Sequence, residues 1–394
     1  MSRWPAPAPA RERRRVAITG MGTVNALTAG GAAAVAGALA ARSGIGPLRA
    51  FAADRCSSRL AAEIDDAVLA ALVDRDAARR LSRICRLTVA ACRLAVEDAR
   101  VRGGPGLAIV VGAEHGDFRS SEEFAGGYLR RGPGGLSPMI FPNTVMNTMA
   151  SVASIAVGAQ AASVTINQAT VVGDLAVARA ATLVASGAAE AAVAGGVDEI
   201  CEIVYRHLCR LGALSPMGGR GEEGCRPFAD DHNGPVLGEG ATFLVLEALD
   251  AARRRGATVL AEIADVAWGA VPAAAHTARP RRRDHGSPVA RLLHAHAGRP
   301  GGFRRCYGAG NGDPAVDDWE RALLAHDLAG SEAGLVPPIS LAPLFGQHGG
   351  LGALRVAAAA LDAARGLGPV LVHGIARGGC RTALVVVPPP EQAA

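Results

Sequence analysis

A β-branched run that changes abruptly into a helical pattern places one polar residue where chemistry is favoured. The predicted strand consists of Ser163, Val164, Thr165, Ile166 and Asn167. A helical pattern rich in Ala and Val follows and ends near Gly187, so Gln168 lies at a strand-to-helix corner. Backbone N–H groups and the positive end of the helix dipole converge at such a corner, where they lower a thiol pKa and stabilise an oxyanion. An amide is no nucleophile, so Gln168 either marks a degenerate site or simply caps the helix.

The other reactive side chains show no arrangement typical of catalysis or of metal binding. Eight cysteines are scattered along the chain, with no CxxC pair and no metal-ligand spacing. The sequence therefore predicts no metal site and no cofactor, and reduced thiols are expected in a cytoplasmic protein. Cys380 has no base nearby in the sequence and is not expected to act as a nucleophile. His115 and His232 are interpreted as ordinary polar loop residues.

The composition predicts a folded protein and argues against two classes of partner. The chain has 394 residues, of which 49% are hydrophobic and 20% charged, which is enough apolar material for a large core. The longest weakly polar stretch, residues 150–197, is interrupted by Asn167, Gln168, Asp174 and Arg179, which predicts no membrane span. No basic stripe with interleaved aromatic residues indicates nucleic-acid binding. Residues 1–14, rich in Pro, Ala and Arg, are expected to form a disordered arm.

Short β-like runs alternate with Ala-rich helical stretches along the whole chain. This alternation predicts an α/β fold with parallel sheets covered by helices. The order of elements looks repeated, with a break after about Ala264. We therefore expect an N-terminal half at residues 15–264 and a C-terminal half at residues 265–394.

Five ordered motifs resemble the β-ketoacyl synthase family of the thiolase superfamily. The motifs are RVAITGMG (residues 15–22), RSGIG (42–46), SPMIFPNT (137–144), RPFAD (226–230) and LGEGA (237–241). The resemblance covers nearly the whole chain. It implies a thiolase-like duplicated fold, in which two βαβαβαββ halves form layers in the order α-β-α-β-α.

The chain departs from this family at every position that carries catalysis. Gln168 matches the cysteine that accepts the acyl chain, and Ala309 matches the first catalytic histidine. Ala342 matches the lysine and Gln347 the second histidine, unless one inserted residue makes His348 the match instead. A methyl group cannot transfer a proton and an amide cannot accept an acyl chain, so no catalytic residue is expected to be intact.

The C-terminal glycine loop of the family is altered as well. In the family this loop gates the active site through a phenylalanine and carries a Thr-Asn pair. The matching positions here are Arg377, Gly378, Gly379 and Cys380. The resemblance therefore implies a gating loop without its aromatic gate.

This set of substitutions resembles that of the ketosynthase β subunit of type II polyketide synthases, known as the chain-length factor. The resemblance implies a subunit that is not catalytic alone and works within an acyltransferase complex. Its implied partners are an active ketosynthase α subunit in a heterodimer, an acyl carrier protein, and polyketide or fatty acyl intermediates. The strand of residues 163–167 would lie at the dimer interface. Candidate residues for the far end of the substrate tunnel are Phe118, Glu122, Phe124, Met139, Ile140 and Phe141.

Two other functions remain open at this point. Some ketosynthase-like domains with glutamine at the nucleophile position resemble decarboxylases that make starter units from malonyl-acyl carrier protein. In that reading Gln168 would orient the thioester, but those domains keep the histidines that position 309 lacks. The second alternative is a catalytically inert homodimeric scaffold that binds carrier protein.

Overall fold

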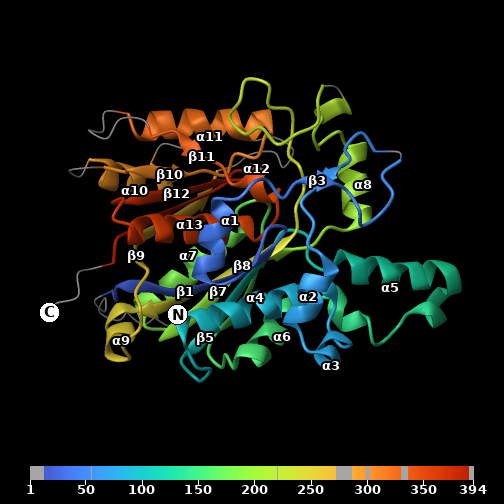
Figure 1. Cartoon of the computed structure of the whole chain (residues 1–394), viewed down its shortest axis with the longest axis horizontal. Helices are drawn as coiled ribbons and strands as arrows, with labels where there is room; N and C mark the ends of the chain where they lie inside the picture. Colours follow the sequence, from blue (N-terminus) through green and yellow to red (C-terminus); the bar gives the residue numbers. More distant parts are fainter. Residues whose placement is uncertain are drawn as a thin grey trace, which may run out of the picture.

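A computed structural model shows a mixed α/β fold built in layers (Figure 1). The structure describes residues 13–54, 56–219, 221–271, 286–298, 302–329 and 336–389. Nearly all of the disordered arm expected at residues 1–14 lies outside these ranges. Within them, no helix is long and apolar enough to cross a membrane.

Five strands of the first half form one continuous part of the main sheet. They are β1 (Val16–Asn25), β5 (Leu107–Ala113), β6 (Ser163–Asn167), β7 (Ala191–Asp198) and β8 (Gly240–Ala248). Their order in space is β6-β5-β7-β8-β1. β5 pairs in parallel with β6 and β7, whereas β8 is antiparallel to β7 and β1.

Five strands of the second half repeat this pattern. They are β9 (Ala261–Ala270), β10 (Arg305–Tyr307), β11 (Pro338–Ile339), β12 (Val370–Ile375) and β13 (Cys380–Val387). Their order is β11-β10-β12-β13-β9, with β10 parallel to β11 and β12, and β13 antiparallel to β12 and β9. If the strands of each half are numbered along the chain, both halves have the order 3-2-4-5-1. This shared order confirms the duplicated α/β fold expected from the sequence.

The two halves meet where β1 pairs with β9. Val16, Ala17 and Ile18 lie opposite Ile263, Glu262 and Ala261 in antiparallel register. The division expected after residue 264 falls within β9.

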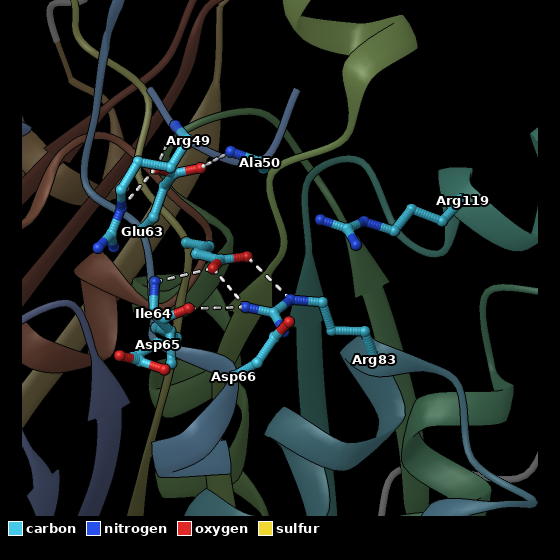
Figure 2. A pocket seen from close by; sticks show the side chains of 9 residues that line it. Arg49, Ala50, Glu63, Ile64, Asp65, Asp66, Arg83 and Arg119 are labelled. Carbon is cyan, nitrogen blue, oxygen red and sulfur yellow. Dashed lines mark hydrogen bonds and ion pairs between the residues drawn. The ribbon is translucent and has the colours of Figure 1, made fainter. Parts of the chain in front are cut away.

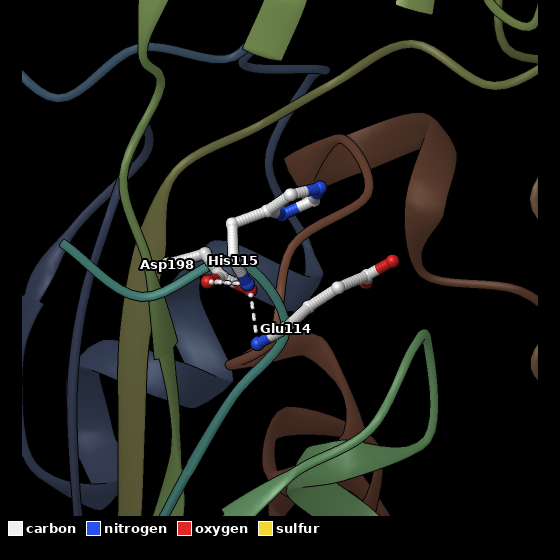
Figure 3. A group of neighbouring side chains, drawn as sticks. All are labelled: Glu114, His115 and Asp198. Atoms are coloured by element: carbon white, nitrogen blue, oxygen red, sulfur yellow. Dashed lines mark hydrogen bonds between the residues drawn. The ribbon is translucent and has the colours of Figure 1, made fainter. Parts of the chain in front are cut away.

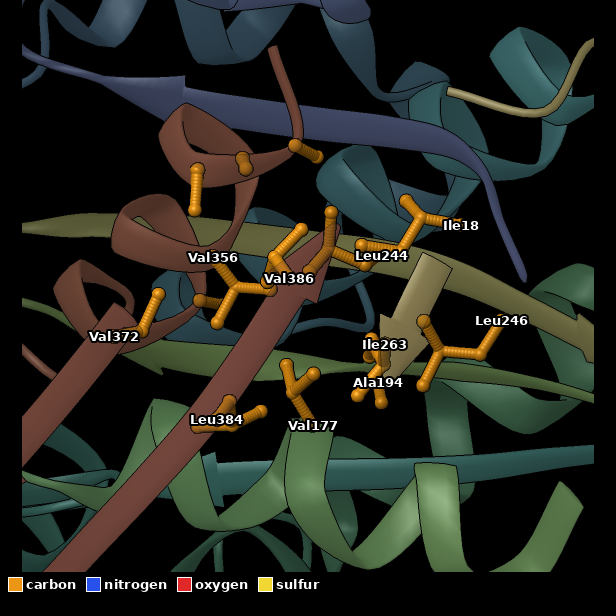
Figure 4. Packing of buried hydrophobic residues seen from close by; sticks show 14 of the residues in the cluster. Ile18, Val177, Ala194, Leu244, Leu246, Ile263, Val356, Val372, Leu384 and Val386 are labelled. Atoms are coloured by element: carbon orange, nitrogen blue, oxygen red, sulfur yellow. The ribbon is translucent and has the colours of Figure 1, made fainter. Parts of the chain in front are cut away.

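Helices cover the strands in three layers. α7 (Val172–Ser186) and α13 (Leu351–Ala364) fill the central layer, and their small side chains pack against strands of both halves (Figure 4). α4 (Arg83–Ala99) and α6 (Thr148–Val157) cover the outer face of the first half. α10 (Pro288–Ala297) covers the second half, together with α11 (Pro314–Asp327). Because α7 and α13 are rich in Ala, they fit closely between the two layers of strands.

Shorter elements connect these layers, and one helical segment extends beyond them. α5 (Phe118–Arg131), with the 3-10 turns η1 (Gly132–Gly135) and η2 (Phe141–Thr144), projects from one side of the body (Figure 1). The remaining elements are β2 (Ala29–Gly30), α1 (Ala32–Leu39), β3 (Gly46–Pro47), β4 (Leu60–Ala61), α2 (Asp66–Leu72), α3 (Arg75–Ala78), α8 (Glu202–Arg210), η3 (Met217–Gly219), α9 (Leu249–Arg254) and α12 (Ala342–Phe345).

Candidate functional site

One pocket gathers polar side chains from loops that follow parallel strands of both halves. Carboxyl ends of parallel strands meet at one edge of a sheet, where α/β proteins bind their ligands. The pocket has a volume of about 140 Å³ and an apolar wall that includes Leu208, Leu214, Leu237 and Val316. Its polar lining consists of Glu114, His115, Thr170, Asn311, Asp313, Gln347 and Arg377. These side chains follow β5, β6, β10, β11 and β12, so the fold brings together residues that are far apart in sequence.

The turn between β6 and α7 directs Thr170 into this pocket. Asn167 ends the strand and fastens it, because its Nδ2 donates to the carbonyl oxygens of Ala113 (2.9 Å) and Glu114 (2.8 Å). Thr170 has a φ of 59°, a left-handed conformation that is unfavourable for a β-branched residue. The buried Thr170 lines the pocket, whereas the half-buried Gln168, two residues earlier, is not among the described lining residues.

The carboxylate of Glu114 occupies a backbone donor at this turn. The Thr170 N–H donates to Oε2 of Glu114 over 2.9 Å. Burial raises the pKa of the Glu114 carboxyl group. A backbone N–H just before a helix is the kind of donor that holds an oxyanion during acyl transfer. Here that N–H already donates to the Glu114 side chain.

Glu114 and His115 lie beside a buried aspartate at the end of β7 (Figure 3). Asp198 accepts the backbone N–H groups of Glu114 (3.1 Å), His115 (3.0 Å) and Gly349 (2.8 Å). These bonds tie the loop after β5 to β7 and to the segment before α13. Burial raises the pKa of Asp198, against the opposing influence of His115 and of these three donors.

The loop after β10 forms the opposite side of the pocket. Nε of Arg377 donates to Oδ2 of Asp313 over 2.7 Å, which joins the loops after β12 and β10. Deeper in the protein, the Glu320 carboxylate accepts the N–H groups of Ala309 (3.0 Å) and Gly310 (2.8 Å). The loop is therefore held by buried side chains that do not themselves line the pocket.

Gln347 supplies an unsatisfied amide to the same pocket. Its side chain is 7% exposed, and within the described residues neither its Oε1 nor its Nε2 has a hydrogen-bond partner. A buried polar group without a partner is costly, which makes this amide a candidate contact for a ligand or a bound water.

A comparison of the sequence with known families decides the class of protein. Residues 13–252, more than half of the chain, match the family "Beta-ketoacyl synthase, N-terminal domain". The chain belongs to the β-ketoacyl synthase family. This assignment confirms the resemblance inferred from the five motifs.

Two bacterial enzymes are among the relatives that are similar in sequence. The 3-oxoacyl-[acyl-carrier-protein] synthase 2 of Synechocystis sp. is 29% identical over 257 residues, which cover 64% of this chain and 62% of the relative. The synthase 2 of Coxiella burnetii is 29% identical over 274 residues, 68% of this chain and 66% of the relative. The matches therefore span a little under two thirds of the length of these relatives.

Solved structures of β-ketoacyl synthases share the whole fold. The ishigamide ketosynthase/chain length factor matches with a TM-score of 0.83 and 23% identity, over 96% of this chain and 100% of the other. A second structure, AntDE:AntF, holds a type II polyketide synthase acyl-carrier protein in complex with its ketosynthase bound to the hexaketide. It matches with a TM-score of 0.79 and 18% identity, over the same shares of the two chains. At these identities the likeness establishes a thiolase-like ketosynthase fold.

The residues matched to the family's catalytic positions are not all brought together in the pocket. Gln347 lines it, whereas His348 lies buried nearby, where its imidazole is close to Gly240. Burial lowers the pKa of His348 to about 4, so this imidazole is neutral near pH 7. Ala309 and Ala342 are fully buried in apolar clusters outside the pocket lining.

The four residues of the expected gating loop have separate roles. Arg377 lines the pocket and is joined to Asp313. Gly378 and Gly379 have φ values of 86° and 91°, in the region that favours glycine, and form the turn between β12 and β13. Cys380 begins β13, and burial raises the pKa of its thiol.

None of the residues expected at the interface strand or in the tunnel is among the described lining residues, although the ring of Phe118 lies 6.5 Å from that of His115. β6 is an edge strand, since it pairs only with β5 within the described chain. Phe118 is 42% exposed, Phe141 55% and Met139 86%, while Phe124 and Ile140 are half-buried and Glu122 is exposed. The rings of Phe124 and Phe141 lie 5.7 Å apart.

Five polar residues of the pocket were not selected from the sequence, namely Glu114, His115, Thr170, Asn311 and Asp313. His115 was interpreted as an ordinary loop residue, and Glu114 and Thr170 were not selected. The available signal was position, because a Glu-His pair directly after a fully buried strand lies where parallel strands end. For Thr170, the helix begins at Val172 and not at residue 169, which moves the corner toward Thr170.

A second polar pocket, of about 340 Å³, lies beside α2 and α5 (Figure 2). Arg83 and Glu239 form a buried ion pair there, with 2.6 Å between Nη2 and Oε1. Glu239 also accepts the N–H groups of Ile64 (2.8 Å) and Ile200 (3.2 Å). Because these charges already have partners, we interpret this pocket as a structural network.

Proposed function

We propose that this chain is a non-catalytic ketosynthase-like subunit, a chain-length factor that pairs with an active ketosynthase and shapes the tunnel for a growing polyketide chain. The single observation that carries the proposal is the polar pocket at the β6–α7 turn. Among its described lining residues there is no cysteine, and the turn presents Thr170. A condensing site needs a nucleophile and the acid-base groups that serve it.

The hydroxyl of Thr170 is a poor replacement for a thiol. A hydroxyl needs a neighbouring base to become a nucleophile, and the nearest carboxylate, that of Glu114, accepts the Thr170 N–H instead. The volume of about 140 Å³ is also below the range of roughly 300–1,000 Å³ that is usual for ligand sites. Both features favour a subunit that does not load an acyl chain by itself.

The surface around β6 and α5 is suited to a partner subunit. An edge strand exposes unpaired backbone groups, and pairing with another chain satisfies them. Exposed apolar side chains surround this edge, among them Phe118, Met139, Phe141, Val145 and Ile155, which is 81% exposed. In the proposed heterodimer, α5 and η2 lie near the far end of the partner's tunnel, where bulky side chains limit chain length.

The proposal is tested by co-expression with an active ketosynthase and its acyl carrier protein. We expect a one-to-one complex on size-exclusion chromatography, and products of altered length when Phe118 or Ile140 is changed to alanine or tryptophan. The matched control is Leu367→Ala, at a partly exposed leucine between α13 and β12. Failure to co-purify contradicts the heterodimer, and unchanged product lengths in all variants contradict tunnel control.

The same material separates the two alternatives. A starter-unit decarboxylase would release carbon dioxide from malonyl-acyl carrier protein without a ketosynthase, and Gln168→Ala would abolish the release. Gln168 does not line the pocket within the described chain, which argues against that role. A homodimeric scaffold would bind carrier protein without any ketosynthase. The eight cysteines, all unpaired, suit the cytoplasm, where we place the proposed function.

A further inference from the structure

We propose that Glu114, His115 and Asp198 bind a divalent first-row transition-metal ion, with the Gln347 amide facing the same site. This inference goes beyond the proposed function and does not depend on it. The three residues follow β5 and end β7, so they meet where two parallel strands terminate (Figure 3). The sequence predicted no metal site because that expectation rested on cysteine spacing, whereas these ligands come from two separate strands.

The distances suit a cation. One ligand atom from each of the three residues lies within 4.8 Å of the other two. A zinc ion about 2.1 Å from each ligand holds tetrahedral neighbours roughly 3.4 Å apart. A modest rotation of Glu114 and His115 covers the difference, since both side chains are only half-buried.

Both carboxylates are already positioned by hydrogen bonds and keep capacity for a metal. Oε2 of Glu114 accepts the Thr170 N–H, which leaves Oε1 for a ligand. Asp198 is held by three backbone N–H groups, two on Oδ2 and one on Oδ1, so Oδ1 retains a lone pair for a metal ion. Hydrogen bonds of this kind orient metal ligands in established sites.

An independent observation comes from Gln347. Its amide lines the same pocket as Glu114 and His115, is 7% exposed, and has no partner for Oε1 or Nε2 among the described residues. A metal ion would accept Oε1 as a ligand, or a metal-bound water would bridge to the amide.

The charges of the pocket favour a cation over an anion. Glu114 brings a carboxyl group to one side of it, and the buried Asp198 carboxyl group lies behind this lining, within 4.8 Å of the ligand atoms of Glu114 and His115. The guanidinium of Arg377, on the other side, is paired with Asp313. A carboxylate or phosphate ligand would meet like charge, whereas imidazole and carboxylate oxygens together are a ligand set for Zn²⁺ and Co²⁺.

The test uses the purified full chain after removal of metals with a chelator. Co²⁺ is titrated and followed by visible absorption, and Zn²⁺ is then added in competition. We expect one equivalent of Co²⁺, displaced by Zn²⁺, without the near-ultraviolet charge-transfer band of thiolate ligands. His115→Ala and Glu114→Gln should each weaken binding at least about tenfold, and Gln347→Leu should weaken it to a smaller extent. His294→Ala, at an exposed histidine on α10, is the control and should bind as the wild type does.

Two results overturn the proposal. One is no saturable binding of either ion. The other is binding that persists unchanged in His115→Ala and Glu114→Gln, or that carries a thiolate band, which would assign the ion to cysteines. Thermal melting without metal shows whether each variant is folded, and a rise in melting temperature with Zn²⁺ that is lost in His115→Ala provides a second readout. No ketosynthase partner is involved, so failure here leaves the proposed function untouched, and failure of the proposed function leaves this site untouched.

Discussion

Glu199 gives the structure a pH dependence that one substitution should remove. This residue follows β7 and its side chain is 1% exposed. Both carboxyl oxygens lack a hydrogen-bond partner within the described chain, and the nearest cation, Nε of Arg119, is 3.5 Å away. Burial, the largest cause, raises the pKa of Glu199 from its ordinary value of 4.5 to about 8.

The sign of the effect follows from counting protons. Between these two pKa values the folded protein keeps the Glu199 proton, whereas the unfolded chain has lost it. Fewer protons bound in the unfolded state means that stability falls as the pH rises. Each pKa unit corresponds to about 1.4 kcal/mol, so the full interval from 4.5 to about 8 is worth roughly 5 kcal/mol. This is an upper value, because Arg119 moves closer or water enters when the carboxylate forms.

Glu199→Gln keeps the size of the side chain but cannot lose a proton. We expect the variant and the wild type to have similar stability near pH 5, and the variant to be more stable by several kcal/mol near pH 9. The measurement is the urea midpoint at several pH values, followed by the fluorescence of the three tryptophans. Glu123→Gln, at an exposed position on α5, is the control and should follow the wild type. If the curves of wild type and Glu199→Gln run parallel from pH 5 to 9, the raised pKa is wrong.

Three further outcomes are expected. Asp174→Asn should destabilise the chain by about 3–5 kcal/mol in urea unfolding, because it leaves the buried Arg355 guanidinium without its charge partner, and Asp174→Leu with Arg355→Met should recover much of this loss. Burial lowers the pKa of His348 from 6.5 to about 4. Between these values the unfolded chain binds a proton at this residue and the folded chain does not, so the free energy of unfolding falls as the pH drops from 6.5 toward 4. Between pH 6.5 and pH 4, the free energy of unfolding should therefore fall by up to about 3 kcal/mol less in His348→Leu than in the wild type. Melting curves at several pH values measure this difference. Gln168→Cys should leave the chain unacylated by acyl-acyl carrier protein in intact-mass spectrometry, since Thr170 and not Gln168 lines the pocket; a loaded thiol would contradict this placement.

The prediction from the sequence was most accurate where a local residue pattern alone determines the bounds of a helix or strand. β6 has the predicted bounds, because a β-branched run is followed at once by a turn. The first motif, residues 15–22, gives no sign that β1 continues through its glycines to Asn25. Gly20 and Gly22 lie against the backbone of α4, where a Cβ would come within 2.4 Å and 2.3 Å of neighbouring atoms. Close packing between a strand and a helix leaves no signal in the sequence of the strand itself.

The site was harder to predict, for a physical reason. Its polar lining comes from loops after five strands, so spacing along the chain carries little information. Gln347 was selected by its position in a motif, and the structure places it in the pocket. Thr170 was missed because the helix starts three residues later than the Ala-rich pattern indicated, and the intervening turn places it in a left-handed conformation. Helical propensity does not report such a turn, since tertiary contacts decide it.

The duplicated topology explains why polar side chains gather in a pocket whose described lining holds no cysteine. Loops after parallel strands of both halves converge on this pocket. The ion pair between Asp174 of α7 and Arg355 of α13 joins the two central helices. In this chain the donor before α7 is already engaged by Glu114, and Arg377 is joined to Asp313. Stabilisation of an oxyanion in acyl transfer requires N–H donors that have no other acceptor when the negative charge forms on the substrate oxygen. Restoring a thiol alone would therefore leave the site without its electrostatic part, so the inertness we propose is built into the hydrogen-bond pattern as well as into the missing nucleophile.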